Sequence, residues 1–149
     1  MCYELIISTN YENDLKAFNQ HHLLYFEKLE KQDYCHNLHY PHQYRIATMR
    51  PDCCSCSVRI FGDDMAGSFE YQFVPFQDWC ETLDESFDNV VYLFDVISNL
   101  VNQGHDVDSF VAWNGNENNK PIKIMNINTN DIIKEHFAFF ENVYFYYEK

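Results

Sequence analysis

Cysteine and histidine side chains are concentrated in one short part of the chain. Four of the six cysteines and three of the seven histidines lie between residues 35 and 56. Thiolate and imidazole groups bind zinc in proteins, usually four to a structural ion. The sequence therefore offers a zinc site made of Cys54, Cys56 and one or two members of a second group, which consists of Cys35, His36, His39 and His42.

The spacing of these residues leaves other uses open. Zinc-binding cysteines usually occur as Cys-x2-Cys, whereas one residue separates Cys54 from Cys56, and Pro41 interrupts the helix that the histidine spacing would need. A thiol enzyme would need a thiolate beside a cation such as Arg59, and a redox pair would close a small, strained disulfide ring. The simplest interpretation places both cysteines in the core beside Val58 and the histidines in a surface loop.

The charge of the chain is strongly negative and unevenly distributed. Ten Lys and Arg against 23 Asp and Glu give a formal net charge of -13, and residues 51–104 contain ten acidic residues but only one basic residue, Arg59. Nucleic acids and anionic membranes are bound by patches of Lys and Arg, so the composition disfavours both partners. An acidic face from Asp63 to Asp88 would instead suit a basic protein, as in an immunity or inhibitor protein.

Length and composition predict one folded domain over residues 1–149. The chain is 46% hydrophobic and 17% aromatic, with four Gly and four Pro, which is unlike a disordered protein. Its apolar runs are far shorter than the roughly 20 residues of a membrane span, and its first residues lack the pattern of a secretory signal. We expect a cytoplasmic monomer or homodimer whose cysteines are thiols.

Alternating apolar residues predict strands in the first half of the chain. Tyr3, Leu5 and Ile7 share one face of a strand, and residues 22–29 and 43–50 are further candidates. Residues 53–61 are predicted to pair with 43–50 as an antiparallel hairpin, which would place Cys54 and Cys56 on the same face as Val58 and Ile60. A short strand is expected at residues 69–73.

One long helix is predicted at residues 83–103. Thr82 and Glu85 match a capping box, and Gly104 stands where glycine commonly ends a helix. Between them, apolar residues recur at helical spacing along one stripe, which consists of Leu83, Phe87, Val90, Val91, Phe94, Ile97 and Val101. This stripe requires a sheet or another apolar surface to cover it.

The remaining elements complete an α+β domain. Residues 107–113 and 122–127 are predicted to be strands of a hairpin, because the Asn-Gly pair at Asn114 and Gly115 favours a turn between them. A short helix is expected at residues 131–140, followed by an aromatic strand at 143–147. The predicted fold is a mainly antiparallel sheet packed against one long helix and one short C-terminal helix.

Four short motifs are spread over most of the chain. They are Cys-Tyr-Glu-Leu at residues 2–5, Cys-Ser-Cys-x-x-Arg at 54–59, Gly-His-Asp-Val-Asp at 104–108 and Phe-Phe-Glu-Asn at 139–142. Together they resemble a family of small uncharacterised bacterial proteins. The resemblance implies a bacterial protein of one domain and assigns no catalytic residue.

These patterns favour an interaction module that binds a basic protein partner, without a cofactor, over an enzyme. The alternative is a metal-binding protein or metalloenzyme that uses zinc and a ligand set drawn from Cys54, Cys56, His36, His39 and His42. A thiol or redox enzyme is the third possibility.

Overall fold

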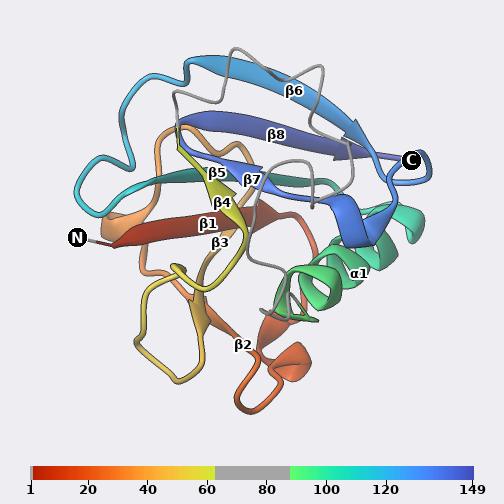
Figure 1. Ribbon diagram of the computed structural model, residues 1–149, viewed down its shortest axis with the longest axis horizontal. Helices are drawn as coiled ribbons and strands as arrows, with labels where there is room; N and C mark the ends of the chain where they lie inside the picture. The colour runs from red at the N-terminus through yellow and green to blue at the C-terminus, as the bar shows by residue number, and fades with distance from the viewer. Residues whose placement is uncertain (1, 63–87) are drawn as a thin grey trace.

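A six-stranded sheet forms the centre of the computed structural model, which describes residues 2–62 and 88–149 (Figure 1). The strand order is β2-β3-β1-β5-β8-β6. Its strands are β1 (Tyr3–Thr9), β2 (Leu24–Lys28), β3 (His42–Thr48), β5 (Val107–Trp113), β6 (Lys123–Asn128) and β8 (Val143–Glu148). All neighbours are antiparallel except β6 and β8, which are parallel. The structure confirms the expected α+β class with a mostly antiparallel sheet.

Short elements complete the described chain. β4 (Ile60–Phe61) and β7 (Phe139–Phe140) pair in parallel as a separate two-stranded sheet. Three 3₁₀ turns lie at Leu15–Phe18, Lys31–Asp33 and Lys134–His136.

The long helix α1 (Asp88–Asn102) packs on one face of the central sheet. Leu5 and Ile7 of β1 point to this face, where they join a core of aliphatic and aromatic side chains. From α1 the buried members are Val90, Leu93, Phe94, Val96, Ile97, Leu100 and Val101. The predicted apolar stripe is therefore confirmed from Val90 onward, because most of its members are buried in this core.

Helix α1 ends in a Schellman motif at Gly104, as the sequence predicts. The Gly104 N–H donates to Val101 O at 3.0 Å, and the His105 N–H donates to Leu100 O at 3.0 Å. Gly104 has φ of +92°, a conformation that side chains with a Cβ rarely adopt. The chain can therefore reverse within three residues and enter β5.

The opposite face of the sheet is covered by the chain segment between β2 and β3. Ile6 of β1 and Phe110 of β5 point to this face, because side chains alternate along a strand. Cys35 and Leu38 of the covering segment pack on them. The sheet is therefore buried on both faces near its centre, and every residue of β1 after Tyr3 is buried.

Both predicted hairpins are wrong. Residues 53–59 form turns, and only Ile60 and Phe61 are extended, paired with β7 instead of β3. Strand β8 lies between β5 and β6, so these two strands are not neighbours. Strand β8 carries the aromatic residues that fill the core, whereas β6 is largely exposed and lies at the edge. Local turn signals did not reveal these long-range pairings.

The short C-terminal helix predicted at residues 131–140 is a single 3₁₀ turn followed by β7. Arg59 explains the difference, because its Nη1 donates to the carbonyl oxygens of Glu135 and Phe137, both at 2.9 Å. These carbonyls would otherwise be available to continue a helix. The predicted capping box at Thr82 and Glu85 and the strand at 69–73 lie outside the described residues.

Within the described ranges, no helix has the length and apolar character that crossing a membrane requires.

We expect Leu93→Ala to lower the free energy of unfolding by about 2–5 kcal/mol, since Leu93 is fully buried between α1 and the sheet. Urea denaturation followed by circular dichroism measures this change. Asn99→Ala, at an exposed position of the same helix, should change stability by less than about 0.5 kcal/mol. Equal effects of the two substitutions would contradict the packing of α1.

Candidate metal centre

Ser55 fixes the position of a loop that contains three cysteines. The strands β1 and β3 pair only from Ile6 and Arg45 onward, so backbone groups before Ile6 and after Arg45 need other partners. Ser55 lies between them: its N–H donates to Tyr3 O at 3.1 Å, and its hydroxyl accepts from Leu5 N at 3.0 Å and donates to Ile46 O. Ser55 is completely buried. The residues on either side of it are therefore held at the start of β1.

This arrangement brings together Cys2, Cys54 and Cys56. Their three Sγ atoms all lie within 4.8 Å of one another, although 52 positions separate Cys2 from Cys54 in the sequence. The backbone N–H of Tyr3 also donates to Cys56 Sγ at 3.3 Å. Cys2 and Cys54 are half-buried, and Cys56 is exposed. The five described cysteines are all free thiols.

The three thiols have unequal acidities. Partial burial acts to raise the pKa of Cys54, but hydrogen bonds from Cys56, Cys2 and Cys53 outweigh it and lower that pKa below 9.0. Burial and the hydrogen bond with Cys54 raise the pKa of Cys56 to about 12. The hydrogen bond with Cys54 also raises the pKa of Cys2. Cys54 is therefore the thiol of this cluster that ionises first.

The separation of the sulfur atoms is close to what a metal ion requires. A tetrahedral zinc ion with Zn–S bonds of about 2.3 Å places its ligand sulfurs about 3.8 Å apart, and a trigonal ion with similar bonds places them about 4.0 Å apart. The observed upper limit of 4.8 Å exceeds these values by about 1 Å or less. Rotation of the thiol side chains can supply such a change.

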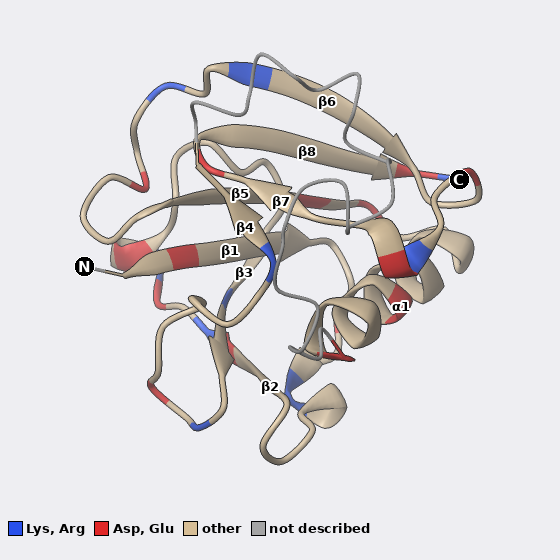
Figure 2. Ribbon diagram, viewed as in Figure 1, with Lys and Arg blue, Asp and Glu red and all other residues tan. Residues whose placement is uncertain are grey.

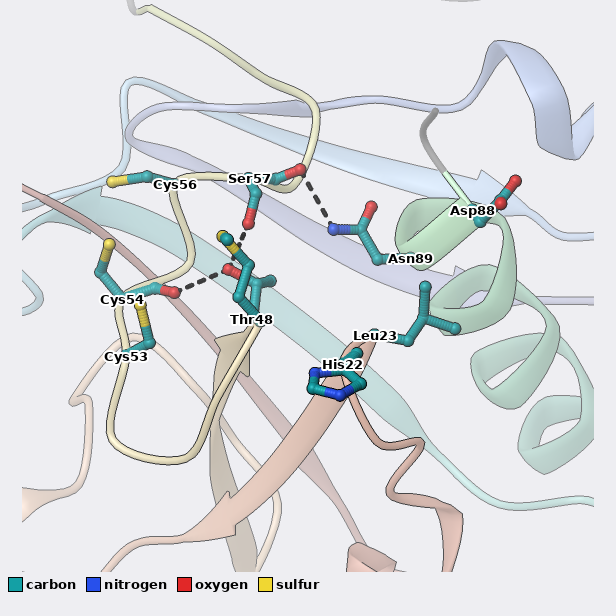
Figure 3. A pocket seen from close by; sticks show the side chains of 10 residues that line it. His22, Leu23, Thr48, Cys53, Cys54, Cys56, Ser57, Asp88 and Asn89 are labelled. Carbon is teal, nitrogen blue, oxygen red and sulfur yellow. Dashed lines mark hydrogen bonds between the residues drawn. The ribbon is translucent and has the colours of Figure 1, made fainter. Parts of the chain in front are cut away.

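The cysteine loop forms one wall of a cavity of about 670 Å³. Figure 3 shows Cys53, Cys54 and Cys56 on one side of this cavity and Asp88 and Asn89 of α1 on another. Asn89 Nδ2 donates to the carbonyl oxygen of Ser57 at 3.1 Å, which links the helix to the loop (Figure 3). Two members of the cluster, Cys54 and Cys56, therefore adjoin a space that a ligand or ion of modest size can enter.

The structure does not bring the predicted histidine ligands to Cys54 and Cys56. His42 pairs with Thr9 at the end of β1, while the cysteines adjoin Tyr3 at its beginning. Six residues of strand span about 20 Å. A ligand set that joins these cysteines to His42 is therefore incompatible with this fold.

His36 and His39 are engaged at other places. His36 lies in the covering segment, and its backbone N–H donates to Oδ1 of Asn118, in the connection between β5 and β6, at 2.7 Å. His39 Nδ1 lies 2.9 Å from the Tyr144 hydroxyl, which donates to Asp108 at 2.7 Å. Burial raises the pKa of the fully buried Asp108, while hydrogen bonds from Ser8, Tyr144 and the His39 backbone oppose that rise. These contacts hold the covering segment on the sheet.

Cys35 is also separate from the cluster. It is buried, its thiol donates to Glu117 O at 2.9 Å, and burial raises its pKa to about 11. Cys54 and Cys56 do not pack in the core beside Val58 as the simplest interpretation expected, because the loop is not a strand and exposes Cys56. Cys2 was missed as a ligand, although the sequence placed it at the start of the first predicted strand.

The predicted acidic face, Asp63 to Asp88, lies outside the described residues apart from Asp88. In the part of the chain that the structure covers, Asp and Glu occur on strands, on α1 and in several loops (Figure 2). An acidic interaction face therefore stays a prediction from the sequence.

Comparison of the chain with models of protein families, with curated proteins and with solved structures finds no match in any of the three. The resemblance to small bacterial proteins stays a prediction.

We expect Ser55→Ala to destabilise the fold by about 1–3 kcal/mol, because Leu5 N–H and Ile46 C=O would lose a buried partner. Denaturant titration measures the loss, and Ser98→Ala on helix α1 serves as the matched control. The substitution should also raise the pKa of Cys54 by loosening the thiol cluster. A stable variant with an unchanged Cys54 pKa would show that Ser55 does not position the loop.

Titration of the thiols should show one ionisation with a pKa below the usual 9.0 and another with a pKa well above it. The neighbouring thiols donate hydrogen bonds to the first thiolate, which stabilises it and makes the next thiol harder to ionise. The ultraviolet absorbance of thiolate, recorded against pH, measures both steps. Cys54→Ser should remove the lower step and Cys35→Ser should leave it unchanged. Persistence of the lower step in Cys54→Ser would assign the acidic thiol elsewhere.

Proposed function

We propose that this protein binds a thiophilic metal ion, zinc or monovalent copper, through Cys2, Cys54 and Cys56. The observation that carries this proposal is the convergence of three thiol sulfurs within 4.8 Å, from two segments that are distant in sequence. Thiolate ligands select zinc, monovalent copper and iron–sulfur centres over hard cations. The lowered pKa of Cys54 supports the proposal, since a thiol must lose its proton to bind a metal.

The number of thiol ligands distinguishes a structural metal site from a catalytic one. A structural zinc ion usually has four protein ligands, whereas a catalytic zinc ion has three and keeps one position open. Monovalent copper, as a soft ion, is also suited to three thiolates. Cys53, whose thiol hydrogen-bonds to Cys54, could become a fourth ligand after a change of rotamer. Without it, the fourth position is open to an external ligand from the adjoining cavity.

A thiol enzyme is the second candidate, and the cavity beside Cys54 favours it. A nucleophilic cysteine needs a stabilised thiolate and access to substrate. Cys54 has a lowered pKa and lines the 670 Å³ cavity. The neighbours that stabilise its thiolate are other thiols and not a cation, which is more typical of a metal site than of a nucleophile with a histidine base.

The interaction module that binds a basic partner stays a prediction from net charge. Its acidic segment is almost entirely outside the described residues, so the metal site is the function that the described geometry supports best.

We expect the protein, purified without a metal-affinity tag, to contain about one equivalent of zinc or copper per chain. Elemental analysis measures the content, and cobalt(II) added to metal-free protein should give the absorbance of thiolate coordination. Cys54→Ser and Cys56→Ser should each reduce metal affinity by at least about tenfold. At a metal concentration of 100 times Kd, binding should stabilise the fold by about 2.7 kcal/mol.

Two controls separate this proposal from its alternatives. Cys35→Ser and His42→Ala should retain the metal, because both residues lie away from the cluster. A metal content below about a tenth of an equivalent, together with no cobalt–thiolate absorbance, would overturn the proposal. Rapid alkylation of Cys54 in protein that fails both metal tests would favour the thiol enzyme instead.

A further inference from the structure

A second cavity, of about 320 Å³, lies on the face of the sheet opposite α1. Its floor is formed by Glu4 and Ile6 of β1 and Arg45 of β3. Its walls are two segments joined by hydrogen bonds: Cys35 Sγ and Asn37 Nδ2 both donate to the carbonyl oxygen of Glu117, at 2.9 and 3.1 Å. The cavity is therefore pre-formed, and it is separate from the cysteine cluster.

Glu4 contributes a buried carboxylate that is only partly satisfied. The residue is 4% exposed, and its Oε1 accepts from Asn114 Nδ2 at 3.0 Å and from Arg45 Nη1 at 3.4 Å. Among the described residues, no donor meets its Oε2. A buried charged acceptor without a partner is costly, so this oxygen is where an added donor would gain most. Consistent with this, burial raises the pKa of Glu4 even though Arg45 and Asn114 act to lower it.

The charges around the cavity favour a cation. Arg45 is the basic residue of the lining, and its guanidinium lies 2.8 Å from Glu27, 3.4 Å from Glu4 and 4.0 Å from Asp52. Three carboxylates already share its positive charge, so little remains to attract an anion. Asp33 and Glu117 add two more acidic groups to the lining.

The same residues disfavour a bare divalent metal ion. An ion bound at Glu4 would lie close to the guanidinium of Arg45, and one buried carboxylate is too few hard ligands for calcium or magnesium. An ammonium or guanidinium cation needs fewer ligands, because it carries a single charge and its N–H groups donate directional hydrogen bonds. Leu29, Ile6 and Tyr34 provide apolar wall for an aliphatic chain, and the Tyr34 ring is fixed by its hydroxyl bond to Pro41 O at 2.8 Å.

We propose that this cavity binds a small organic cation, an ammonium or guanidinium group on a short aliphatic chain, with the carboxylate of Glu4, which lines the cavity, accepting its hydrogen bond. The volume of about 320 Å³ suits a molecule of that size. Asp33, at the exposed rim, adds a longer-range attraction for a second positive group of the same ligand. This site is independent of the proposed metal site.

Calorimetry and nuclear magnetic resonance with agmatine and butylamine test the proposal, and succinate serves as the anionic probe. We expect saturable binding of agmatine, weaker binding of butylamine and none of succinate, with shifts at the side-chain amides of Asn114 and Asn118. Glu4→Gln, which keeps the shape of the side chain, should weaken agmatine binding by at least about tenfold. Asp95→Asn, at a half-exposed position on α1 across the sheet from the cavity, should leave it unchanged.

Three results would contradict the proposed site or its selectivity for cations. Absence of saturable amine binding up to about 10 mM, or equal affinity of Glu4→Gln and the natural protein, would overturn the site. Preferential binding of succinate would overturn its charge selectivity. If Glu4→Gln fails to fold, Asp33→Asn at the exposed rim replaces it, with an expected several-fold loss of affinity for agmatine and a smaller loss for butylamine.

Discussion

Ser55 completes the hydrogen bonding of two strands that separate before they end. The strands β1 and β3 are paired up to Ile6 and Arg45, and beyond this point the backbone groups of Tyr3, Leu5 and Ile46 bond to Ser55. Because these groups are buried, they must find partners within the protein. The neighbours of Ser55 are consequently held beside the N-terminal end of β1, where Cys2 meets Cys54 and Cys56. The three cysteines therefore meet because the buried backbone groups of the sheet need hydrogen-bond partners.

The central position of β1 gives the protein two separate sites. One face of this strand supplies Leu5 and Ile7 to the core under α1, while the other supplies Glu4 and Ile6 to the second cavity. The cysteine cluster lies at the beginning of the strand, beside the cavity that α1 helps to form. Each site therefore uses a different surface of the same strand. The strand is buried and paired with a neighbour on each side, which fixes the positions of the residues that it gives to both sites.

The two sites differ in how their polar groups are satisfied. In the cysteine cluster, three thiols hydrogen-bond to Cys54 and stabilise one thiolate, so that the site favours soft cations. In the second cavity, Arg45 neutralises part of the charge of Glu4 and leaves one carboxylate oxygen without a donor. Two of the histidines that the sequence offered as metal ligands, His36 and His39, lie in the covering segment and help to hold it in place instead. His39, for example, contacts Tyr144 beside the buried Asp108.

The sequence by itself determined the elements whose signals are local. Alternation predicted β1 and β5, and the apolar stripe with Gly104 predicted the described part of α1 and its end, because burial of one face and positive φ leave marks on neighbouring residues. Only the tertiary structure decided the partners. The insertion of β8 between β5 and β6, the pairing of β4 with β7 and the insertion of Ser55 all join residues far apart in the chain. The sequence could show that Cys54 and Cys56 were available, but their proximity to Cys2 instead of the histidines arises from hydrogen bonds that no local pattern encodes.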